Sequence, residues 1–381
     1  MTTMLLNEEQ RLLRDSAQEF LAARSPVSAL RRLRDTRDAL GFAPELWAEM
    51  TEMGWPASVF PEAYGGLDFG YKGLGAIFEQ MGRTLTASPL FATVVLGGGI
   101  LLEAGSEAQR SEWLPRIVAG DARFALAVDE KPRHDPRAIA TKAWRTDAGG
   151  WCLEGEKWFV LDGHVATRLI VVARTAGQPG DVRGISLFLV DPSAGGVSVE
   201  RTHMVDSRNA ARVRLRDVHV GEDALIGVAD GGFAALDAVL DRARICLAAE
   251  TLGVIRETFD QTIAYLKQRV QFGVPIGSFQ ALQHRAARLY AEIELLQSCV
   301  AAALSAVDEG SGDVAQLASL AKARAADLGE RVLNEGVQMH GGIGVTDELD
   351  LGLFLKRARA MQGTFGDGVF HRARYAALRG F

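Results

Sequence analysis

The residues best suited to chemistry lie in the last third of the chain, in two short segments rich in amides and glycine. One is Arg269–Gly273, which is followed by Gln280, and the other is Gln338–Gly342. A planar guanidinium matches two phosphate oxygens and keeps its charge at any relevant pH. Paired glycines let a backbone approach a phosphate or ribose without an intervening Cβ. These properties suit contact with a phosphorylated ligand, while the alternatives are a helix C-terminal cation for Arg269 and a helix C-cap for the paired glycines.

A third segment, Met361-Gln362-Gly363-Thr364, carries an amide at its centre. A neutral amide has no useful proton affinity near pH 7, so Gln362 is not expected to remove a proton from a substrate. The carboxylate of Asp367 lies five residues further on.

Composition limits the classes of protein to consider. The chain has 381 residues, 48% of them hydrophobic, a net charge of −6 and a pI near 5.7. This charge argues against sequence-independent nucleic-acid binding, which needs a basic surface. The three cysteines have no metal-ligand spacing, so we expect no zinc site and no disulfide framework. We expect no membrane span, since no stretch reaches about 20 apolar residues, and a cytoplasmic location.

The pattern of elements is helical, then β, then helical. We expect an N-terminal helical domain over 1–121, a middle β-domain over 122–228 and a C-terminal helical domain over 229–381. An amphipathic helix is expected from Asn7 to about Arg24. Long helices are expected over 233–268 and from about Ser278 to Gly310. The short strand-like runs of the middle domain, separated by turn signals, indicate a compact barrel or sandwich.

These motifs and this order of elements resemble the acyl-CoA dehydrogenase family over nearly the whole chain. The most specific part is the block of Arg269, Phe272 and Gly273 with the following Phe279 and Gln280. The resemblance implies an α+β fold with a helical N-terminal domain, a middle β-barrel or sandwich and a C-terminal four-helix bundle. It also implies FAD as the cofactor and an acyl-CoA thioester as the substrate.

The resemblance assigns several residues to a FAD molecule held by a neighbouring subunit. In the family the arginine matching Arg269 reaches the pyrophosphate, and the phenylalanine matching Phe272 packs near the adenine half. Gln338 and Gly342 match the glutamine and second glycine of a QxxGGxG turn that contacts the same FAD. Gln280 is expected on this surface, and His340 is expected to have a packing role.

Around the redox face the chain departs from the family. Members usually carry a Thr-Glu-Pro-x-x-Gly-Ser-Asp loop whose hydroxyls bind the flavin, but the corresponding run 128–136 lacks both hydroxyls. Phe159 keeps an aromatic wall, whereas Leu161 replaces the threonine that donates a hydrogen bond to flavin N5. Losing such a donor weakens stabilisation of the charge that develops on the flavin. Thr364 is a further cofactor-binding candidate.

Gln362 occupies the position of the family's glutamate base, so no catalytic residue is assigned. Ala243 occupies the alternative position that some relatives use for the base. Asp241 lies about 200° around the helix from Ala243 and cannot replace it. In the family, Asp241 and Arg244 would lie near the acyl-CoA channel, and a surface ion pair is the alternative.

Three functions remain open. The first is a non-catalytic or half-site subunit of a heteromeric α2β2 acyl-CoA dehydrogenase, whose homologous partner supplies the base. Such assemblies act on bulky substrates such as steroid side chains in lipid catabolism, with electron-transfer flavoprotein as a partner. The second is an active homotetramer with a non-standard base such as Asp367. The third is a flavin-dependent monooxygenase on the same fold, which needs no α-proton base.

Overall fold

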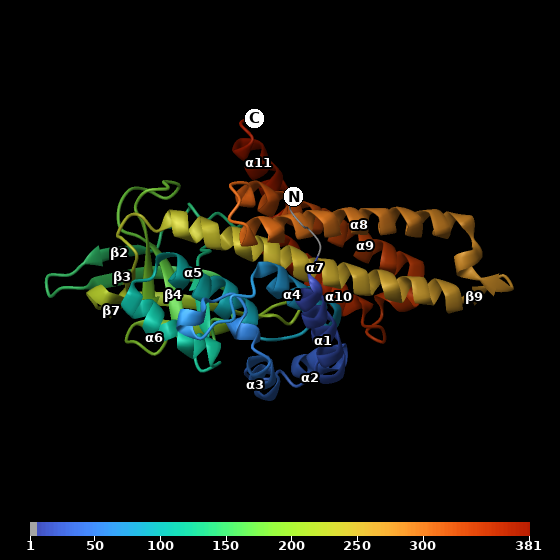
Figure 1. Ribbon diagram of the computed structural model, residues 1–381, viewed down its shortest axis with the longest axis horizontal. Coiled ribbons are helices and arrows are strands. Elements are labelled where there is room, and N and C mark those ends of the chain that lie inside the picture. Colours follow the sequence, from blue (N-terminus) through green and yellow to red (C-terminus); the bar gives the residue numbers. More distant parts are fainter. Residues whose placement is uncertain (1–5) are drawn as a thin grey trace. The chain divides into compact units, whose positions relative to one another are not determined.

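The computed structural model describes residues 6–381 (Figure 1). These residues form two compact units, each built from segments that are distant in sequence. Unit 1 combines the chain up to Arg32 with Tyr71–Thr86 and Arg244–Phe381, and unit 2 combines Leu33–Gly70 with Ala87–Ala243. The predicted order of helices, strands and helices is confirmed, while the three predicted domain boundaries stay predictions.

The N-terminal third is helical, as expected. Its helices are α1 (Glu8–Arg24), α2 (Val27–Asp35), α3 (Pro44–Glu52), α4 (Tyr71–Thr84), α5 (Gly99–Ala104) and α6 (Glu107–Val118), with the short turns η1 (Trp55–Ala57) and η2 (Glu62–Tyr64) and the π-helix η3 (Phe91–Gly98). Helix α1 begins where predicted because Asn7 and Gln10 form a capping box, in which each side chain accepts a hydrogen bond from the other's backbone N–H.

The middle of the chain forms one eight-stranded sheet. Its strands are β1 (Phe124–Ala127), β2 (Lys142–Arg145), β3 (Trp151–Leu161), β4 (Arg168–Arg174), β5 (Ile185–Val190), β6 (Val197–His203), β7 (Asn209–Val220) and β8 (Leu225–Ile226). The order is β6-β7-β3-β2-β4-β5-β8, and β1 pairs with β4 in parallel. Among the described strands the ends do not pair, so the expected barrel is not closed.

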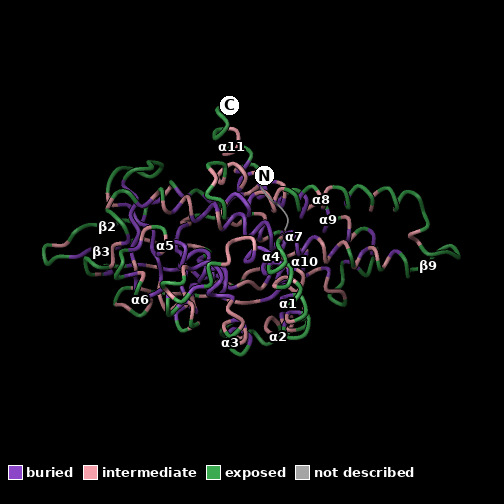
Figure 2. The backbone as a smooth tube through the Cα atoms, viewed as in Figure 1, coloured by how far each residue is buried: buried purple, intermediate pink, exposed green. Residues whose placement is uncertain are grey.

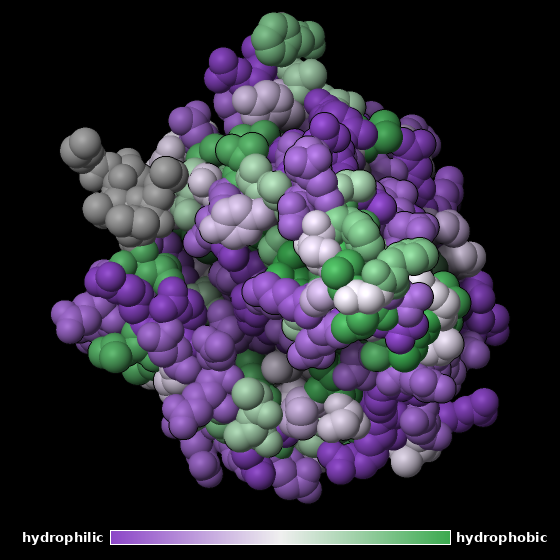
Figure 3. Space-filling model, turned by 90° about the vertical axis from the view of Figure 1, so that its right-hand side faces the viewer, coloured by the Kyte–Doolittle hydropathy of each residue, from purple (hydrophilic) through white to green (hydrophobic). Residues whose placement is uncertain are grey.

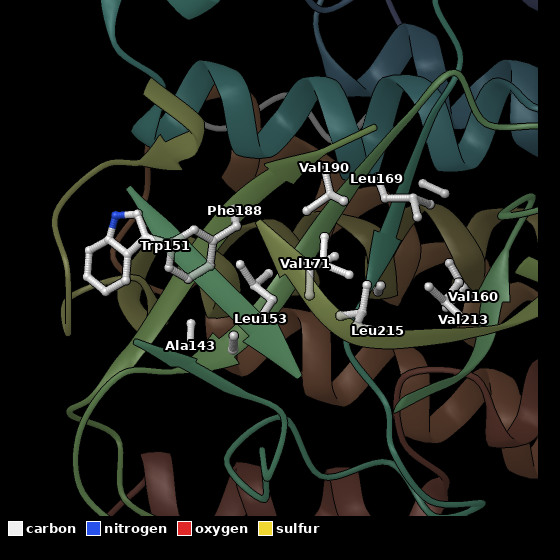
Figure 4. Packing of buried hydrophobic residues seen from close by; sticks show 14 residues of the cluster. Ala143, Trp151, Leu153, Val160, Leu169, Val171, Phe188, Val190, Val213 and Leu215 are labelled. Atoms are coloured by element: carbon white, nitrogen blue, oxygen red, sulfur yellow. The ribbon is translucent and has the colours of Figure 1, made fainter. Parts of the chain in front are cut away.

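One face of this sheet carries a continuous apolar core. Trp151 packs edge-on against Phe188, with ring centroids 5.2 Å apart. Valines and leucines from β3, β4 and β7 extend this cluster along the sheet (Figure 4). The strands that carry the candidate residues of the middle domain are therefore rigidly held.

The C-terminal part consists of long helices joined by tight turns. They are α7 (Phe233–Gln268), α8 (Gln280–Asp308), α9 (Val314–His340), α10 (Leu351–Gly363) and α11 (Gly368–Leu378), with the turns η5 (Ile276–Ser278) and η6 (Gly341–Val345). A further turn, η4 (Glu222–Ala224), lies earlier, between β7 and β8. The predicted bounds of α7 are confirmed, and α8 lies within two residues of its prediction. In unit 1, α4 and α7 cross closely at two glycines: a Cβ on Gly253 would lie 1.8 Å from the carbonyl oxygen of Glu79.

Helix α8 differs from the expectation that no segment is long and apolar enough to cross a membrane. By length and composition alone α8 qualifies, and among the described helices it is the one that does. Core helices of bundles meet the same criteria, and α8 packs against α4 and α9 within unit 1. We therefore interpret α8 as a bundle helix.

Candidate functional site

A two-stranded hairpin projects from unit 1 between α7 and α8 (Figure 1). It consists of β9 (Val270–Gln271) and β10 (Val274–Pro275), joined by Phe272 and Gly273. Both turn residues have positive φ, 55° and 82°, as a two-residue hairpin of the mirror-image type requires. A phenylalanine pays a steric penalty in this region, and the Phe272 side chain is 91% exposed. Its ring meets that of Phe279 edge-on, with ring centroids 6.1 Å apart, and its remaining exposed surface suits contact with another molecule.

The other residues expected to face a neighbouring FAD lie at the same end of unit 1. Arg269 follows the last turn of α7, and Gln280 opens α8. Gln338 lies in the last turn of α9, and Gly342 lies in the following turn η6; all four residues are exposed. Within the described residues, the Arg269 side chain has no hydrogen bond or ion pair. The ends of α7 and α9 are held together by Tyr265, which stacks on His340 with ring centroids 4.4 Å apart.

Several further apolar side chains are exposed at this end: Val270, Val274, Phe279, Ile343 and Val345. Figure 3 looks toward this end and shows hydrophobic residues gathered among hydrophilic ones. The hairpin itself is drawn in green in Figure 2, because its residues are exposed. An exposed apolar cluster with a polar rim is typical of an interaction surface.

The Gln362 amide makes polar contacts with residues of α9 and α10. Its Nε2 donates to Glu330 Oε2 at 3.0 Å, and its Oε1 accepts from Arg359 Nη1 at 3.2 Å. Arg359 also pairs with Glu330 Oε1 at 3.0 Å. Hydrogen bonds from Gln362 and Arg359 lower the pKa of Glu330, so this carboxylate is a weak base. Glu330 was not predicted from the sequence.

The backbone of the turn 361–366 is held by a buried lysine that the sequence analysis missed. Lys322 Nζ donates to the carbonyl oxygens of Met361, Gln362 and Gly366 at 3.0, 3.1 and 2.9 Å. Burial and the nearby Arg244 lower the pKa of Lys322 to about 7. The sequence does contain an indication that Lys322 is buried. Lys322 follows Ala318 by four residues and precedes Ala326 by four, so it lies on the small-residue face of α9.

Two more basic side chains hold the same turn. Arg244 Nε donates to the carbonyl oxygen of Phe365 at 3.2 Å, and His371 Nε2 lies 3.0 Å from the same oxygen. Burial is the main cause that lowers the pKa of His371 to about 2, and Arg244 and Lys322 add to it. His371 is therefore neutral and donates to Phe365.

Asp241 and Arg244 are both buried, so the alternative of a surface ion pair is wrong. Thr364 donates its hydroxyl to the carbonyl oxygen of Ala360 at 2.9 Å, which leaves the oxygen lone pairs for another donor. Asp367 caps α11 by accepting from Phe370 N at 2.8 Å. This capping role occupies the carboxylate that was considered as a non-standard base.

In unit 2, the end of β3 carries the candidate flavin-facing residues. A bulge between Lys157 and Val160 changes the pairing register with β7, and bulges commonly re-aim side chains near sites. It contains Phe159, which has a φ of 53° and is exposed. Leu161 is buried and offers no hydrogen-bond donor. The aromatic wall is thus available, whereas the missing donor is not replaced by this side chain.

The loop after β1 is held by its own charged residues. Lys157 is completely buried and donates to Glu130 Oε1 at 2.6 Å and to the carbonyl oxygen of Val128 at 3.1 Å. Glu130 also accepts from the backbone N–H groups of Ala140 and Thr141. Burial alone would raise the pKa of Glu130, but Lys157 and these hydrogen bonds lower it. An ion pair therefore fixes the loop in which relatives present hydroxyls.

One cluster could ligate a metal. Cys152, Asp217 and His219 offer ligand atoms that all lie within 4.8 Å of one another, on adjacent strands β3 and β7. Sequence spacing hid this group because the sheet brings together residues that are over 60 positions apart. Asp217 and His219 are exposed, and such groups are common without an ion, so the expected absence of a metal stays a prediction.

The fold and these sites define a flavin-dependent dehydrogenase architecture, and comparisons with known proteins agree. Models of the N-terminal, middle and C-terminal domains of acyl-CoA dehydrogenases match residues 7–121, 125–218 and 230–377. The chain belongs to the acyl-CoA dehydrogenase family. FAD is the cofactor of this family, and dehydrogenation of acyl-CoA is its reaction.

Three relatives illustrate the similarity. Acyl-CoA dehydrogenase FadE12 of Mycobacterium tuberculosis is 30% identical over 94% of this chain and 92% of its own. A structure of the Tcur3481–Tcur3483 steroid acyl-CoA dehydrogenase is 32% identical, covers 98% of each chain and has a TM-score of 0.87. The ChsE4–ChsE5 complex from Mycobacterium tuberculosis is 26% identical, covers 99% of this chain and 98% of its own, and has a TM-score of 0.89.

The residues present fit one part of FAD better than the other. The exposed guanidinium of Arg269 and the open backbone at Gly342, where a Cβ would meet nothing within 4 Å, suit a pyrophosphate and a ribose. At the flavin end, Leu161 stands where relatives carry a hydroxyl donor, and the run 128–136 contains no serine or threonine. The donors that suit the pyrophosphate and ribose are thus present, whereas Leu161 offers no donor at the flavin end.

Proposed function

We propose that this chain is the non-catalytic or half-site subunit of a heteromeric acyl-CoA dehydrogenase. The observation that carries the proposal is Gln362: an amide, hydrogen-bonded to Glu330 and Arg359, stands in the position of the family's base. An α-proton of a thioester is weakly acidic, and a positioned base contributes roughly 10²–10⁴-fold in rate. A homologous partner that carries the glutamate would supply this step.

The unpaired interface residues support the same proposal. Arg269 and Phe272 are exposed and could contact a partner subunit. The flavin-facing run 128–136 and position 161 lack the hydroxyl groups that relatives carry there. Two of the similar structures consist of two named proteins each, and one of these is called a steroid acyl-CoA dehydrogenase. We therefore propose an α2β2 assembly acting on a CoA thioester with a bulky, steroid-like acyl group, with electron-transfer flavoprotein as the acceptor.

The visible flavin spectrum of the purified chain tests this proposal. We expect little bound FAD and no bleaching when steroid-like or straight-chain acyl-CoA thioesters are added under anaerobic conditions. Co-expression with a homologous chain that carries the glutamate should give a stable complex whose flavin bleaches. Stoichiometric FAD that bleaches in the isolated chain would refute the proposal.

Gln362→Glu in the isolated chain distinguishes two causes of inactivity, a missing base and a flavin-binding face that lacks its hydrogen-bond donors. Because Leu161 and the ion-paired loop remain, we expect this variant to stay unable to bleach flavin. Thr364→Ser, which keeps the adjacent hydroxyl, is the matched control for disturbance of the turn. Bleaching by Gln362→Glu alone would mean that the redox face is intact and that only the base is missing.

A further inference from the structure

A cavity of about 350 Å³ in unit 2 plays no part in the function proposed above. It is formed by the end of α2, the following loop to Gly41, the end of β6 and the β6–β7 loop. Its polar lining includes Arg34, Arg37, Arg201, His203, Ser207 and Arg208, and no carboxylate is among the described lining residues.

One of these arginines is fixed by the surrounding backbone. Arg201 donates to the carbonyl oxygens of Asp38 and Ala39 and, at 3.0 Å, to Asn209 Oδ1. Asn209 in turn donates to the carbonyl oxygen of Leu40 at 2.8 Å. The loop approaches so closely at Gly41, which has a φ of 68°, that a Cβ there would lie 2.1 Å from Asn209 Oδ1. The cavity wall is therefore preorganised.

A second arginine is available for a ligand. Arg37 has a φ of 49°, lines the cavity and makes no hydrogen bond or ion pair with any described residue. A non-glycine residue in this conformation is uncommon. Here it adds a guanidinium, whose five N–H donors bond to no described residue, to the lining of a site that already carries positive charge.

The charge of this cavity is only partly compensated. Arg34 pairs with Asp35 at 2.7 Å. Burial raises the pKa of Asp162 to about 7, against the opposing effect of Arg208 and Arg201, so this carboxyl offsets less positive charge than an ordinary aspartate. Burial and Arg201 lower the pKa of His164 to about 4, and both of its ring nitrogens are buried without a hydrogen-bond partner.

We propose that this cavity binds the phosphate group of a small phosphorylated molecule. Guanidinium groups recognise phosphate through paired, charge-assisted hydrogen bonds, and the hydroxyl of Ser207 can donate one more. The volume lies at the lower end of small-molecule sites, which are about 300–1,000 Å³. It exceeds what a free phosphate fills, so the structure favours a phosphate monoester over the free ion.

Calorimetric titration of the full chain at low salt tests the proposal with three probes: ribose 5-phosphate, inorganic phosphate and ribose. We expect saturable binding of ribose 5-phosphate, weaker binding of inorganic phosphate and none of ribose. A dissociation constant above about 10 mM for ribose 5-phosphate would overturn the proposal. Equal affinity for inorganic phosphate would overturn the assignment to an ester.

Arg37→Asn locates the binding, since asparagine tolerates the positive φ. We expect roughly tenfold weaker binding of ribose 5-phosphate from the loss of a charge-assisted contact, and recovery of most of this loss in Arg37→Lys. Arg183→Asn removes an equal charge from an exposed loop of unit 2 and should leave the affinity unchanged. Equal loss in both asparagine variants, or none in Arg37→Asn, would refute the site. Unchanged melting temperatures show that each variant is folded.

Discussion

Replacement of the buried Lys322 by methionine gives a quantitative test of the turn that carries Gln362. The variant removes the partner of three carbonyl oxygens, of which those of Met361 and Gly366 are reached by fully buried hydrogen bonds. An unsatisfied buried acceptor costs about 1–3 kcal/mol. We expect the free energy of unfolding at pH 7 to fall by about 2–5 kcal/mol, since two acceptors are lost and the methionine side chain recovers part of the loss by packing.

The pH dependence of this loss follows from linkage. The pKa of Lys322 is lowered from 10.5 to about 7 in the folded protein. Between these values the unfolded chain binds more protons, so the stability of the wild type rises with pH. Integration gives a rise of about 2 kcal/mol from pH 7 to pH 9, which the methionine variant lacks. The deficit of the variant should therefore grow by this amount.

Guanidinium denaturation followed by circular dichroism at pH 7, 8 and 9 measures both quantities. Lys142→Met, at an exposed position of β2, controls for the loss of one positive charge. A Lys322→Met variant as stable as the wild type at pH 7 would contradict the hydrogen-bonding role assigned to Lys322, and a deficit that does not change up to pH 9 would contradict its lowered pKa.

Three further predictions concern other parts of unit 1. Phe272→Ser should change the free energy of unfolding by less than about 0.5 kcal/mol, because the side chain is exposed, but should weaken subunit association measured by analytical ultracentrifugation. The wild type should lose up to about 1.4 kcal/mol of stability per pH unit below pH 6.5, because the His371 imidazole binds a proton in the unfolded chain but not when buried. His371→Gln should abolish this loss, and denaturation at pH 5–7 measures it. Arg357→Met should destabilise the protein by about 3–5 kcal/mol, because it leaves Glu250, 3.3 Å away and buried, without this partner; thermal unfolding measures the effect.

The long-range order of helices and strands was predictable because hydrophobic periodicity and turn residues report it directly. Helix α7 runs from Phe233 to Gln268 without an internal proline, and the residues that end it are local. The closure of the sheet was not predictable, since the alternation of strands and turns is the same in an open sheet and in a barrel.

The candidate site was predictable where it depends on local motifs. The hairpin at Phe272 and the glycines after Gln338 stand at turns, as their spacing indicated. The contacts of Gln362 were not predictable, because Glu330 lies 32 residues away and only the packing of α9 on α10 brings it near. The contacts of buried cations such as Lys157 were not predictable for the same reason, because their partners are set by tertiary structure.

The turn 361–366 separates the groups that hold its backbone from the side chain that stands in the position of the family's base. Lys322, Arg244 and His371 all contact main-chain carbonyl oxygens there. The Gln362 amide instead contacts Glu330 and Arg359. Under the proposed function, a substitution at position 362 therefore changes the chemistry of this position and its contacts to α9, while the main-chain contacts that hold the turn are retained.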